Sequence, residues 1–408
     1  MEPNVEPQLS PVIPPPPPKR RRFTIRVVLA LVLIGLLCGG FIGYAVTYAD
    51  FNAKLNSLQS QMGHYQSSTS GSSTNTCLLS DNANVSLANL YAQVKNSVVV
   101  IKDLIPQYGF FGGLMGYSIQ QGSGFVVKVN NQLVVVTNNH VIEDSINVTV
   151  TFANGDSLPA TVLGSDSKAD LAILSVSSMP SYAVALTLVS SATLQVGDPV
   201  VAVGSPYGLS GTLTTGVISA LGRTITVSDS GTNSQTIPDM IQTSTAINSG
   251  NSGGPLINYA GEVVGITTAA VSNSEGLGFA VPSSTIIREI NSLVTTGSYD
   301  QHPSINAQGT DMNYQIAQAM NAPVTYGWLV ESVSTQNGLK GGDTQKSIMG
   351  SRVIIGGDII TAINGQRITN GDDLLSYLER NALPGQTMNF TVIRDGQTQT
   401  VQVTIGKA

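Results

Sequence analysis

Three polar residues in the middle of the chain have the side chains that acyl transfer requires. His140 lies in the segment TNNHVI, Asp170 in the segment ADLAIL and Ser252 in the segment NSGNSGGP. Acyl transfer needs a hydroxyl nucleophile, an imidazole that takes its proton, and a carboxylate that orients the imidazole. Glycines around Ser252 would let the backbone turn its N–H groups toward a developing oxyanion. The three segments together predict a catalytic triad of the serine type.

Each residue also has a simpler explanation when it is taken alone. His140 could be a structural histidine, Asp170 a cap at the end of a strand, and Ser252 an ordinary turn residue. The triad is favoured because the other two histidines, His64 and His302, lie outside the strand-rich region that contains all three candidates. Four further carboxylates are alternative partners for the imidazole: Asp144, Asp156, Asp166 and Asp198.

The elements that must position these residues are strands. Between residues 98 and 267, short apolar runs alternate with turn signals, and the Asn-Gly-Asp sequence at 154–156 is a hairpin signal. Many short strands at regular spacing are typical of antiparallel barrels or a sandwich. An amphipathic helix should then begin near Ser283 and end near Gly297. We therefore expect a mainly β domain at residues 81–297.

The first 80 residues have a different composition. Residues 1–23 contain a run of five prolines followed by a basic cluster, which predicts an extended, solvated tail. Residues 24–48 include 20 consecutive uncharged positions, enough for one transmembrane helix, and the basic cluster before them predicts a cytoplasmic N-terminus. A cleaved signal peptide is the alternative, but its apolar region would be only ~7–15 residues long. Residues 49–80 are expected to form a stalk and a Ser/Thr-rich linker.

The composition excludes several classes of protein. Hydrophobic residues make up 41% of the chain, which excludes wholesale disorder. A formal net charge of −6 argues against a nucleic-acid partner. Two cysteines cannot form a disulfide framework or a tetrahedral thiolate zinc site, and three histidines leave little room for a histidine-rich metal site. We therefore expect neither a metal nor a cofactor.

Further segments extend the pattern around the three candidates. They are GSPYG at residues 204–208, TGVISA at 215–220 and GLGFAVP at 276–282. Together with the triad segments, they resemble the HtrA (Deg) family of chymotrypsin-fold serine proteases. The resemblance covers nearly all of residues 85–408, and its stretch around Ser252 is highly specific.

The resemblance implies a chymotrypsin-like double β-barrel in which each candidate has a role. His140 would be the general base, Asp170 would orient it, and Ser252 would be the nucleophile. The implied oxyanion hole consists of backbone N–H groups of Gly250, Asn251 and Ser252.

The resemblance also implies a pocket that selects the residue on the acyl side of the cut. Ala246 lies six residues before the nucleophile, at the expected base of the pocket, and Leu277 and Phe279 would help to line it. Such a pocket has no carboxylate, so it cannot stabilise a buried Lys or Arg and discriminates by size. We expect cleavage after small or medium aliphatic residues.

The C-terminal region, residues 298–408, resembles the PDZ domain that follows the protease in this family. The segments GWLV, GDII and ING carry this resemblance, and residues 372–378 should form the helix beside the peptide groove. A PDZ groove binds an extended peptide by strand addition, with the peptide carboxylate held by backbone N–H groups. The matching carboxylate-binding loop comprises Ser304, Ile305, Asn306 and Ala307. The alternative is a rigid spacer that only contacts the protease domain.

The composition of the first 48 residues predicts a single-pass cell-membrane protein, and its orientation places the protease and PDZ domains outside the cytoplasm. The resemblance predicts what these domains do. The protein would be a serine endopeptidase that cleaves misfolded or damaged extracytoplasmic proteins, and it would assemble as a homotrimer or larger. Its partners would be unfolded proteins, peptides in the PDZ groove and the membrane. The alternative is a PDZ-containing binding protein or chaperone with a weak or silent protease domain.

Overall fold

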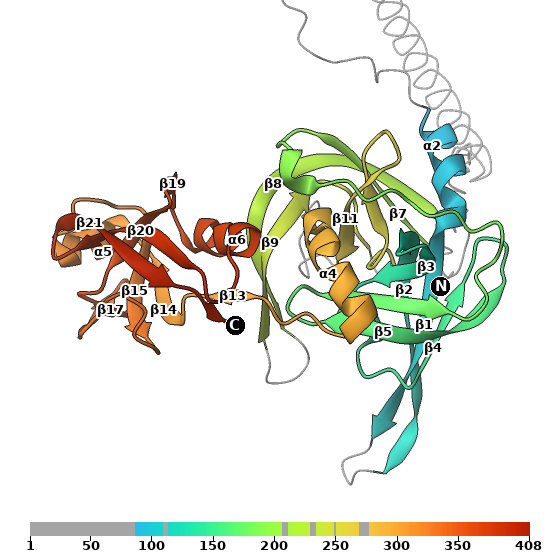
Figure 1. The fold of residues 1–408 in the computed structure, drawn as a ribbon, viewed down its shortest axis with the longest axis horizontal. Helices are drawn as coiled ribbons and strands as arrows, with labels where there is room; N and C mark the ends of the chain where they lie inside the picture. Colours follow the sequence, from blue (N-terminus) through green and yellow to red (C-terminus); the bar gives the residue numbers. More distant parts are fainter. Residues whose placement is uncertain (1–85, 109–112, 206–210, 229–233, 249, 269–276) are drawn as a thin grey trace, which may run out of the picture. The chain divides into compact units, whose positions relative to one another are not determined.

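The computed structural model describes residues 86–408 apart from 109–112, 206–210, 229–233, 249 and 269–276 (Figure 1). The tail, membrane helix and stalk predicted for residues 1–80 lie outside the described residues. Within the part of the chain that is described, no helix is long and apolar enough to cross a membrane. The described chain begins with α2 (Leu87–Val94) and the short 3-10 turn η1 (Lys95–Ser97).

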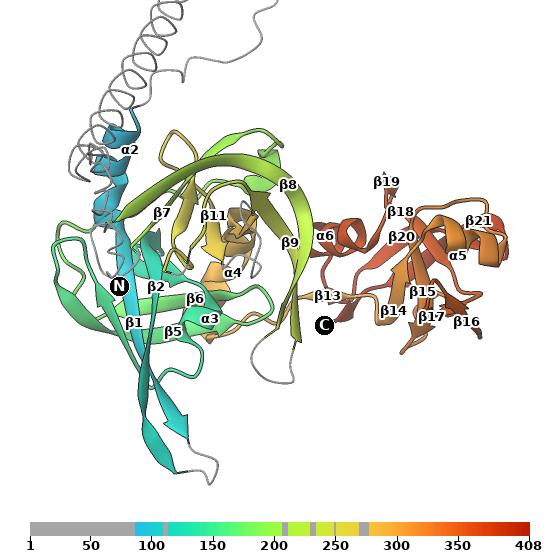
Figure 2. The same ribbon diagram turned by 180° about the vertical axis from the view of Figure 1, so that it is seen from behind.

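The first barrel is closed by six antiparallel strands in the order β1-β2-β3-β6-β5-β4 (Figure 2). Asn130 and Asn131 form the two-residue turn between β2 and β3. Their φ angles of 47° and 68° are those of a type I′ turn, in which asparagine is favoured. The hairpin expected at residues 154–156 is confirmed between β4 and β5, with Gly155 at φ 94°. The strands are β1 (Val98–Tyr108), β2 (Leu114–Val129), β3 (Gln132–Thr137), β4 (Asn147–Thr151), β5 (Ser157–Asp166) and β6 (Leu171–Val176).

The second barrel is also closed by six strands, in the order β10-β11-β12-β9-β8-β7. Its strands are β7 (Pro199–Gly204), β8 (Thr212–Ser228), β9 (Ser234–Thr243), β10 (Pro255–Ile257), β11 (Val263–Thr268) and β12 (Gly278–Pro282). The short turn η2 (Ser191–Thr193) precedes it. The predicted double β-barrel is therefore confirmed.

Helix α4 (Ser283–Thr296) ties the two barrels together. It contacts β5 and β6 of the first barrel and β11 and β12 of the second. Its buried residues join a core cluster that also contains Phe125 of β2 and Val201 of β7. The helix ends at Gly297, as predicted, because this glycine adopts φ 84°, a conformation that terminates helices at little steric cost.

The C-terminal region has its own sheet and its own core. The main sheet has the order β14-β15-β18-β20-β21, with β19 paired to β18. Its largest core cluster includes Val330, Ile360 and Phe390. The elements are β13 (Pro303–Ser304), β14 (Ala307–Asp311), α5 (Tyr314–Met320), β15 (Trp328–Val333), β16 (Thr344–Ile348), β17 (Ser351–Ile355), β18 (Ile359–Ile363), β19 (Gln366–Arg367), α6 (Gly371–Asn381), β20 (Thr387–Arg394), β21 (Gln397–Thr404) and β22 (Gly406–Lys407).

Helix α6 lies against strands β8 and β9 of the second barrel (Figures 1 and 2). The Thr224 N–H donates a hydrogen bond of 3.2 Å to Asp372 Oδ1 at the start of the helix. Near its end, Arg380 forms an ion pair of 2.6 Å with Asp239 of β9. The helix predicted at residues 372–378 therefore exists and also contacts the second barrel.

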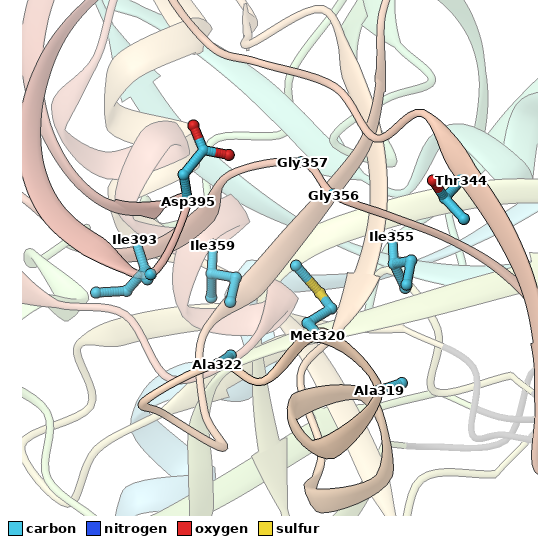
Figure 3. A pocket seen from close by; sticks show the side chains of 11 residues that line it. Ala319, Met320, Ala322, Thr344, Ile355, Gly356, Gly357, Ile359, Ile393 and Asp395 are labelled. Carbon is cyan, nitrogen blue, oxygen red and sulfur yellow. The ribbon is translucent and has the colours of Figure 1, made fainter.

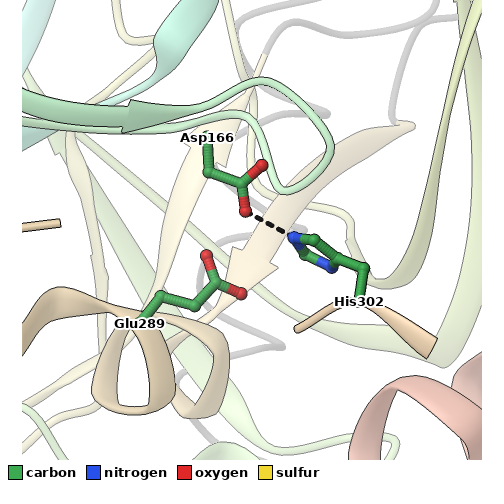
Figure 4. A group of neighbouring side chains, drawn as sticks. All are labelled: Asp166, Glu289 and His302. Atoms are coloured by element: carbon green, nitrogen blue, oxygen red, sulfur yellow. Dashed lines mark hydrogen bonds and ion pairs between the residues drawn. The ribbon is translucent and has the colours of Figure 1, made fainter. Parts of the chain in front are cut away.

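A buried charge cluster lies at the same junction (Figure 4). His302 is held between two carboxylates, with Nε2 2.6 Å from Asp166 Oδ2 and Nδ1 3.0 Å from Glu379 Oε1. The Arg288 guanidinium lies 2.5 Å from both Glu379 Oε1 and Glu289 Oε1. Three carboxyl groups thus face one guanidinium and one imidazole. Asp166, one of the alternative triad carboxylates, belongs to this cluster.

Candidate active site

His140 is presented by a single helical turn, α3 (Asn139–Ile142), that follows β3 directly. The ring Nδ1 lies 2.8 Å from Asp170 Oδ2, and the backbone N–H of His140 donates to Asp170 Oδ1 at 3.0 Å. One carboxylate therefore fixes both the backbone and the ring of the histidine. Because Nδ1–H points at Asp170, the geometry assigns Nε2 as the free acceptor of a proton.

Asp170 is itself held in place from several sides. It occupies the turn between β5 and β6 with φ 52°, a conformation that Asp tolerates better than most residues. Its carbonyl accepts from Asn138 Nδ2 at 2.8 Å, and its Oδ2 accepts from the Thr268 hydroxyl of β11 at 2.8 Å. The carboxylate is only 5% exposed, so these contacts replace water. Among the described carboxylates, Asp170 is the one that hydrogen-bonds to His140.

The electrostatic environment of His140 favours the protonated ring. Burial of the ring opposes protonation, but the charge of Asp170, its hydrogen bond and the nearby Glu143 together outweigh burial. The pKa of His140 is therefore raised above its ordinary value near 6.5. This direction suits a base that must hold a proton during the reaction and then release it.

Ser252 lies in a tight, glycine-rich turn before β10. Gly250 and Gly253 have φ angles of 97° and 84°, and the Gly253 N–H donates to Thr267 O at 2.8 Å. The Asn251 N–H donates to Asn248 O at 2.9 Å, so it is engaged within the loop and does not point to an oxyanion. Of the three donors expected from the sequence, this leaves Gly250 and Ser252 as candidates. Ser249 lies outside the described residues.

Strand β2 of the first barrel brings together residues 250–254 around Ser252, the nucleophile loop, and helix α3, which carries His140. A Cβ atom on Gly122 would lie 2.6 Å from the Val141 side chain and 3.1 Å from Ser252 O, so both segments converge on this glycine. No hydrogen bond joins the Ser252 hydroxyl to the His140 ring in the described part of the chain. Such bonds are often long in unliganded enzymes and tighten when substrate binds.

The residues predicted to form the specificity pocket lie in the segment after β9 and at the start of β12. Ala246 is exposed, and the Thr214 hydroxyl donates to its carbonyl at 3.0 Å. Leu277 is 38% exposed, whereas Phe279 is only 8% exposed and belongs to the core that the two barrels share. Ala246 and Leu277 are therefore the members of the predicted pocket that a substrate can reach most easily.

Two separate pockets lie in the described part of the C-terminal region. The first, of about 460 Å³, lies between β14 and α6 and is lined by Ser304, Ile305, Ala307, Trp328, Leu374 and Leu378. Three of the four residues predicted for the carboxylate-binding loop line it, and the fourth, Asn306, adopts φ 50°. Residues of β9, including Thr236 and Pro238, line the same pocket. The second, of about 260 Å³, lies between Met320, Ile355 and Ile393 (Figure 3).

Two residues that support the candidate site could not be recognised from the sequence. They are Thr268, whose hydroxyl donates to Asp170, and Ser123 of β2, which contacts the nucleophile loop. Each one acts across a large separation in the chain, and neither belongs to a pattern of reactive side chains. The only sequence signal is the position of Ser123 between two glycines in an apolar strand.

Comparisons with known proteins define the class of the chain first. Residues 122–266 match the family described as "Trypsin-like peptidase domain", and residues 324–405 match the family described as "PDZ domain". A trypsin-like peptidase followed by a PDZ domain is the organisation expected from the sequence. The comparisons support the resemblance of the chain to the HtrA (Deg) family of serine proteases.

Individual relatives support the assignment. The chain is 34% identical over 255 residues to the periplasmic serine endoprotease DegP of Escherichia coli K12, covering 60% of this chain and 52% of that protein. It is 36% identical over 295 residues to a probable DegP-like periplasmic serine endoprotease of Brucella suis, covering 70% of this chain and 52% of that protein. The chain thus spans about half the length of the curated relatives that it matches.

A solved structure with a similar fold is that of the HtrA-type protease AlgW with a tripeptide. It has a TM-score of 0.59 and 28% sequence identity, and the match covers 79% of this chain and 97% of that chain. The match to almost the whole of that chain indicates that the protease and PDZ regions together follow the architecture of HtrA-type proteases.

Proposed function

We propose that the chain is a serine endopeptidase that cleaves unfolded or damaged proteins outside the cytoplasm through His140, Asp170 and Ser252. The observation that carries this proposal is the contact of Asp170 with both the ring and the backbone of His140, at 2.8 and 3.0 Å. Such a doubly held imidazole has a defined tautomer and orientation, which general-base catalysis requires.

The residues act in sequence in this proposal. Ser252 Oγ attacks the scissile carbonyl while His140 Nε2 takes its proton, and the Asp170 carboxylate stabilises the imidazolium that forms. The backbone N–H groups of Gly250 and Ser252 stabilise the negative charge on the carbonyl oxygen. His140 then gives its proton to the leaving amine, and water activated by the same imidazole hydrolyses the acyl-enzyme.

The substrate class and location rest on the relatives and on the N-terminal composition. The relatives are described as periplasmic serine endoproteases, and residues 24–48 have the length and composition of a signal anchor. We infer a single-pass protein with its N-terminus in the cytoplasm and with peptides bound in the groove between β14 and α6. Protease-accessibility mapping on intact cells or spheroplasts tests the orientation, because only the region after residue 48 should be digested from outside.

The assembly is proposed to be a homotrimer or larger through the protease domain. Light scattering of residues 81–408 tests this assignment without the membrane segment. A trimer mass supports assembly through the folded domains. A monomer at micromolar concentration would place any assembly in the first 80 residues.

Digestion of a reduced, unfolded protein such as casein tests the proposed activity. The full chain in detergent should release new N-termini, while Ser252→Ala and His140→Ala should release none above background. The competing function, a PDZ-containing binding protein with a silent protease domain, predicts binding of the unfolded protein without cleavage by any of the three proteins.

A further inference from the structure

Ser123 of β2 makes four hydrogen bonds, two of which join the first barrel to the nucleophile loop. Its hydroxyl donates to Gly250 O at 2.6 Å and accepts from the Ser205 N–H at 2.9 Å. Its backbone N–H donates to Ser252 O at 2.8 Å, and its carbonyl accepts from the Thr137 hydroxyl at 2.8 Å. The residue is 0% exposed, so none of these contacts competes with water.

The direction of the hydroxyl proton follows from these contacts. Because Ser123 Oγ accepts a hydrogen bond from the Ser205 N–H, its own proton is available for the Gly250 carbonyl. The two bonds form a short relay from the loop after β7, through Ser123, to the nucleophile loop. Bonds in such a relay polarise and strengthen one another in a buried site.

Ser123 contacts the backbone carbonyls before and after the peptide unit that carries the Ser252 N–H. The hydroxyl holds the carbonyl of Gly250, and the backbone N–H holds the carbonyl of Ser252. The Ser252 N–H belongs to the peptide unit between these two held carbonyls. One residue of the first barrel thus holds the carbonyls on both sides of this peptide unit, whose own carbonyl, Asn251 O, accepts from the Thr267 hydroxyl at 2.6 Å in the second barrel.

The nucleophile loop packs tightly against Ser123, but Gly250 could rotate without this anchor. A Cβ atom on Gly253 would lie 2.1 Å from Ser123 O, so this part of the loop has no space to shift toward β2. Gly250, at φ 97°, has no side chain to restrict its backbone angles. The peptide unit between Gly250 and Asn251 is held at its N–H by the Asn248 carbonyl within the loop, and the hydroxyl of Ser123 holds its carbonyl from outside the loop.

We propose that Ser123 is a positioning residue whose hydroxyl sets the orientation of the oxyanion-hole backbone at Gly250. The inference rests on the proposed peptidase function and extends it to a residue that touches neither substrate nor the reacting atoms. A backbone donor that has lost its orientation affects the transition state, in which the oxyanion forms, more than it affects the bound substrate.

The test compares Ser123→Ala with Ser123→Thr, which keeps the hydroxyl, in the full chain. Direct loss of one oxyanion donor typically costs ~100–1,000-fold in kcat, so we expect an indirect loss of roughly 10- to 100-fold for Ser123→Ala. KM should change by less than about threefold, because substrate contacts remain. Ser123→Thr should recover most of the lost kcat.

Ser283→Ala is the matched control. Ser283, the first residue of α4, is also 0% exposed, and its hydroxyl donates to the Val189 carbonyl. This contact involves neither the triad nor the nucleophile loop. Both substitutions remove a hydroxyl that donates to a backbone carbonyl, although the Ser123 hydroxyl also accepts from the Ser205 N–H. Thermal melting shows how much of any effect comes from general destabilisation, and kcat in Ser283→Ala should stay within about twofold of wild type.

Amide hydrogen exchange of residues 250–254 provides a readout that does not depend on activity. Exchange in this segment should be faster in Ser123→Ala than in wild type, and it should be unchanged in Ser283→Ala. An active wild type with a Ser123→Ala kcat within twofold of it, or unchanged exchange in Ser123→Ala, would overturn the inference. If wild type and Ser252→Ala are equally inactive, the proposed function fails, and the exchange comparison still decides the role of Ser123.

Discussion

The hydroxyl of Thr268 lies 2.8 Å from Oδ2 of Asp170, so the carboxylate that orients His140 is held by the second barrel although it is carried by the first. Thr268 is the last residue of β11, and the N–H of Gly253 binds the carbonyl of its neighbour Thr267. The same end of β11 therefore contacts both the triad carboxylate and the nucleophile loop. In the proposed mechanism, this arrangement would couple the relative position of the two barrels to catalysis.

Removal of the Thr268 hydroxyl should reduce catalysis without abolishing it. Thr268→Val keeps the shape of the side chain but leaves Asp170 with one hydrogen bond fewer, and a bond to a charged group is worth ~1.5–3 kcal/mol. We expect kcat/KM to fall roughly 10-fold. Asp170→Asn should cost far more, because it also disturbs the His140 tautomer.

Thr149→Val is a control for Thr268→Val, since the Thr149 hydroxyl bonds only to the Lys102 carbonyl on the exposed surface. Its kcat/KM should equal that of wild type. Equal rates for Thr268→Val and Thr149→Val would contradict a role for the contact between Thr268 and Asp170.

The pH dependence of hydrolysis should follow the raised pKa of His140. His140 must be neutral to accept the proton of Ser252, and Asp170 stabilises the protonated ring against the effect of burial. The acidic limb of a kcat/KM profile should therefore have its midpoint above ~6.5, with activity rising as the pH increases through it. Peptide hydrolysis between pH 4 and 9 measures this midpoint. A value below 6, or full activity at pH 4, would contradict either the raised pKa of His140 or its role as the base.

Whereas hydrolysis should increase as the pH rises, the free energy of unfolding should fall because of the buried cluster around His302. Burial lowers the pKa of His302, but Asp166 and Glu379 outweigh burial and raise this pKa to about 9. The corresponding stabilisation is fully present below ~6.5 and is lost as the pH rises through about 9. A shift of this size corresponds to an upper limit of about 3 kcal/mol.

Glu289 should also lower the free energy of unfolding as the pH rises, over a pH range that overlaps with that of His302. Burial raises its pKa to about 8, so between ~4.5 and about 8 the unfolded chain releases a proton that the folded chain keeps. The charge of Arg288 lowers this pKa and the charge of Asp166 raises it, but burial has the largest effect. We therefore expect unfolding by urea to be hardest in mildly acidic solution and clearly easier at pH 9.

Two variants separate these contributions. Glu289→Gln keeps a neutral group of the same shape, so it should be at least as stable as wild type at pH 8 and should show a flatter stability profile between pH 5 and 8. His302→Gln should be destabilised at pH 6 and should approach wild type at pH 9.5. The exposed pair of Lys407 and Asp300 provides the comparison, since Lys407→Ala should change little. A wild-type stability that rises from pH 6 to 9 would contradict this account of the cluster.

The cleavage pattern should reflect a small apolar pocket. Ala246 supplies no counter-charge and Leu277 presents an aliphatic surface, so cuts of unfolded casein should follow mainly Val, Ala, Ile, Leu or Thr. Mass spectrometry of the products determines the residue on the acyl side of each cut. Ala246→Asp should add cuts after Lys and Arg. A majority of wild-type cuts after basic residues would refute the pocket assignment.

Helix ends and residues with positive φ angles could be predicted from the sequence, because the residue type at one position largely determines them. Gly297 ends α4 and Asn306 adopts a positive φ angle, as their residue types suggest. The triad segments could also be recognised, since each one carries a reactive side chain in a distinctive context. The bond between Ser123 and Gly250 joins residues 127 positions apart, and that between Thr268 and Asp170 joins residues 98 apart.

Contacts over such separations depend on how the barrels pack, and single side chains do not reveal them. For the same reason, the role of His302 cannot be predicted from the sequence. Its two carboxylate partners come from β5 and α6, which neighbour each other only in the folded chain. The Asn251 N–H was expected in the oxyanion hole, but its bond to Asn248 depends on the exact turn that the loop adopts.

Covalent labelling by a fluorophosphonate probe tests the central claim most directly, since the probe reacts with a serine only when a base and an oxyanion hole activate it. The detergent-solubilised full chain should acquire one adduct, which peptide mapping places on Ser252. Ser252→Ala should acquire none, and His140→Ala should react at least ~1,000-fold more slowly. A folded wild-type chain that stays unlabelled with and without added peptide, or that is labelled equally after Ser252→Ala, would contradict the account.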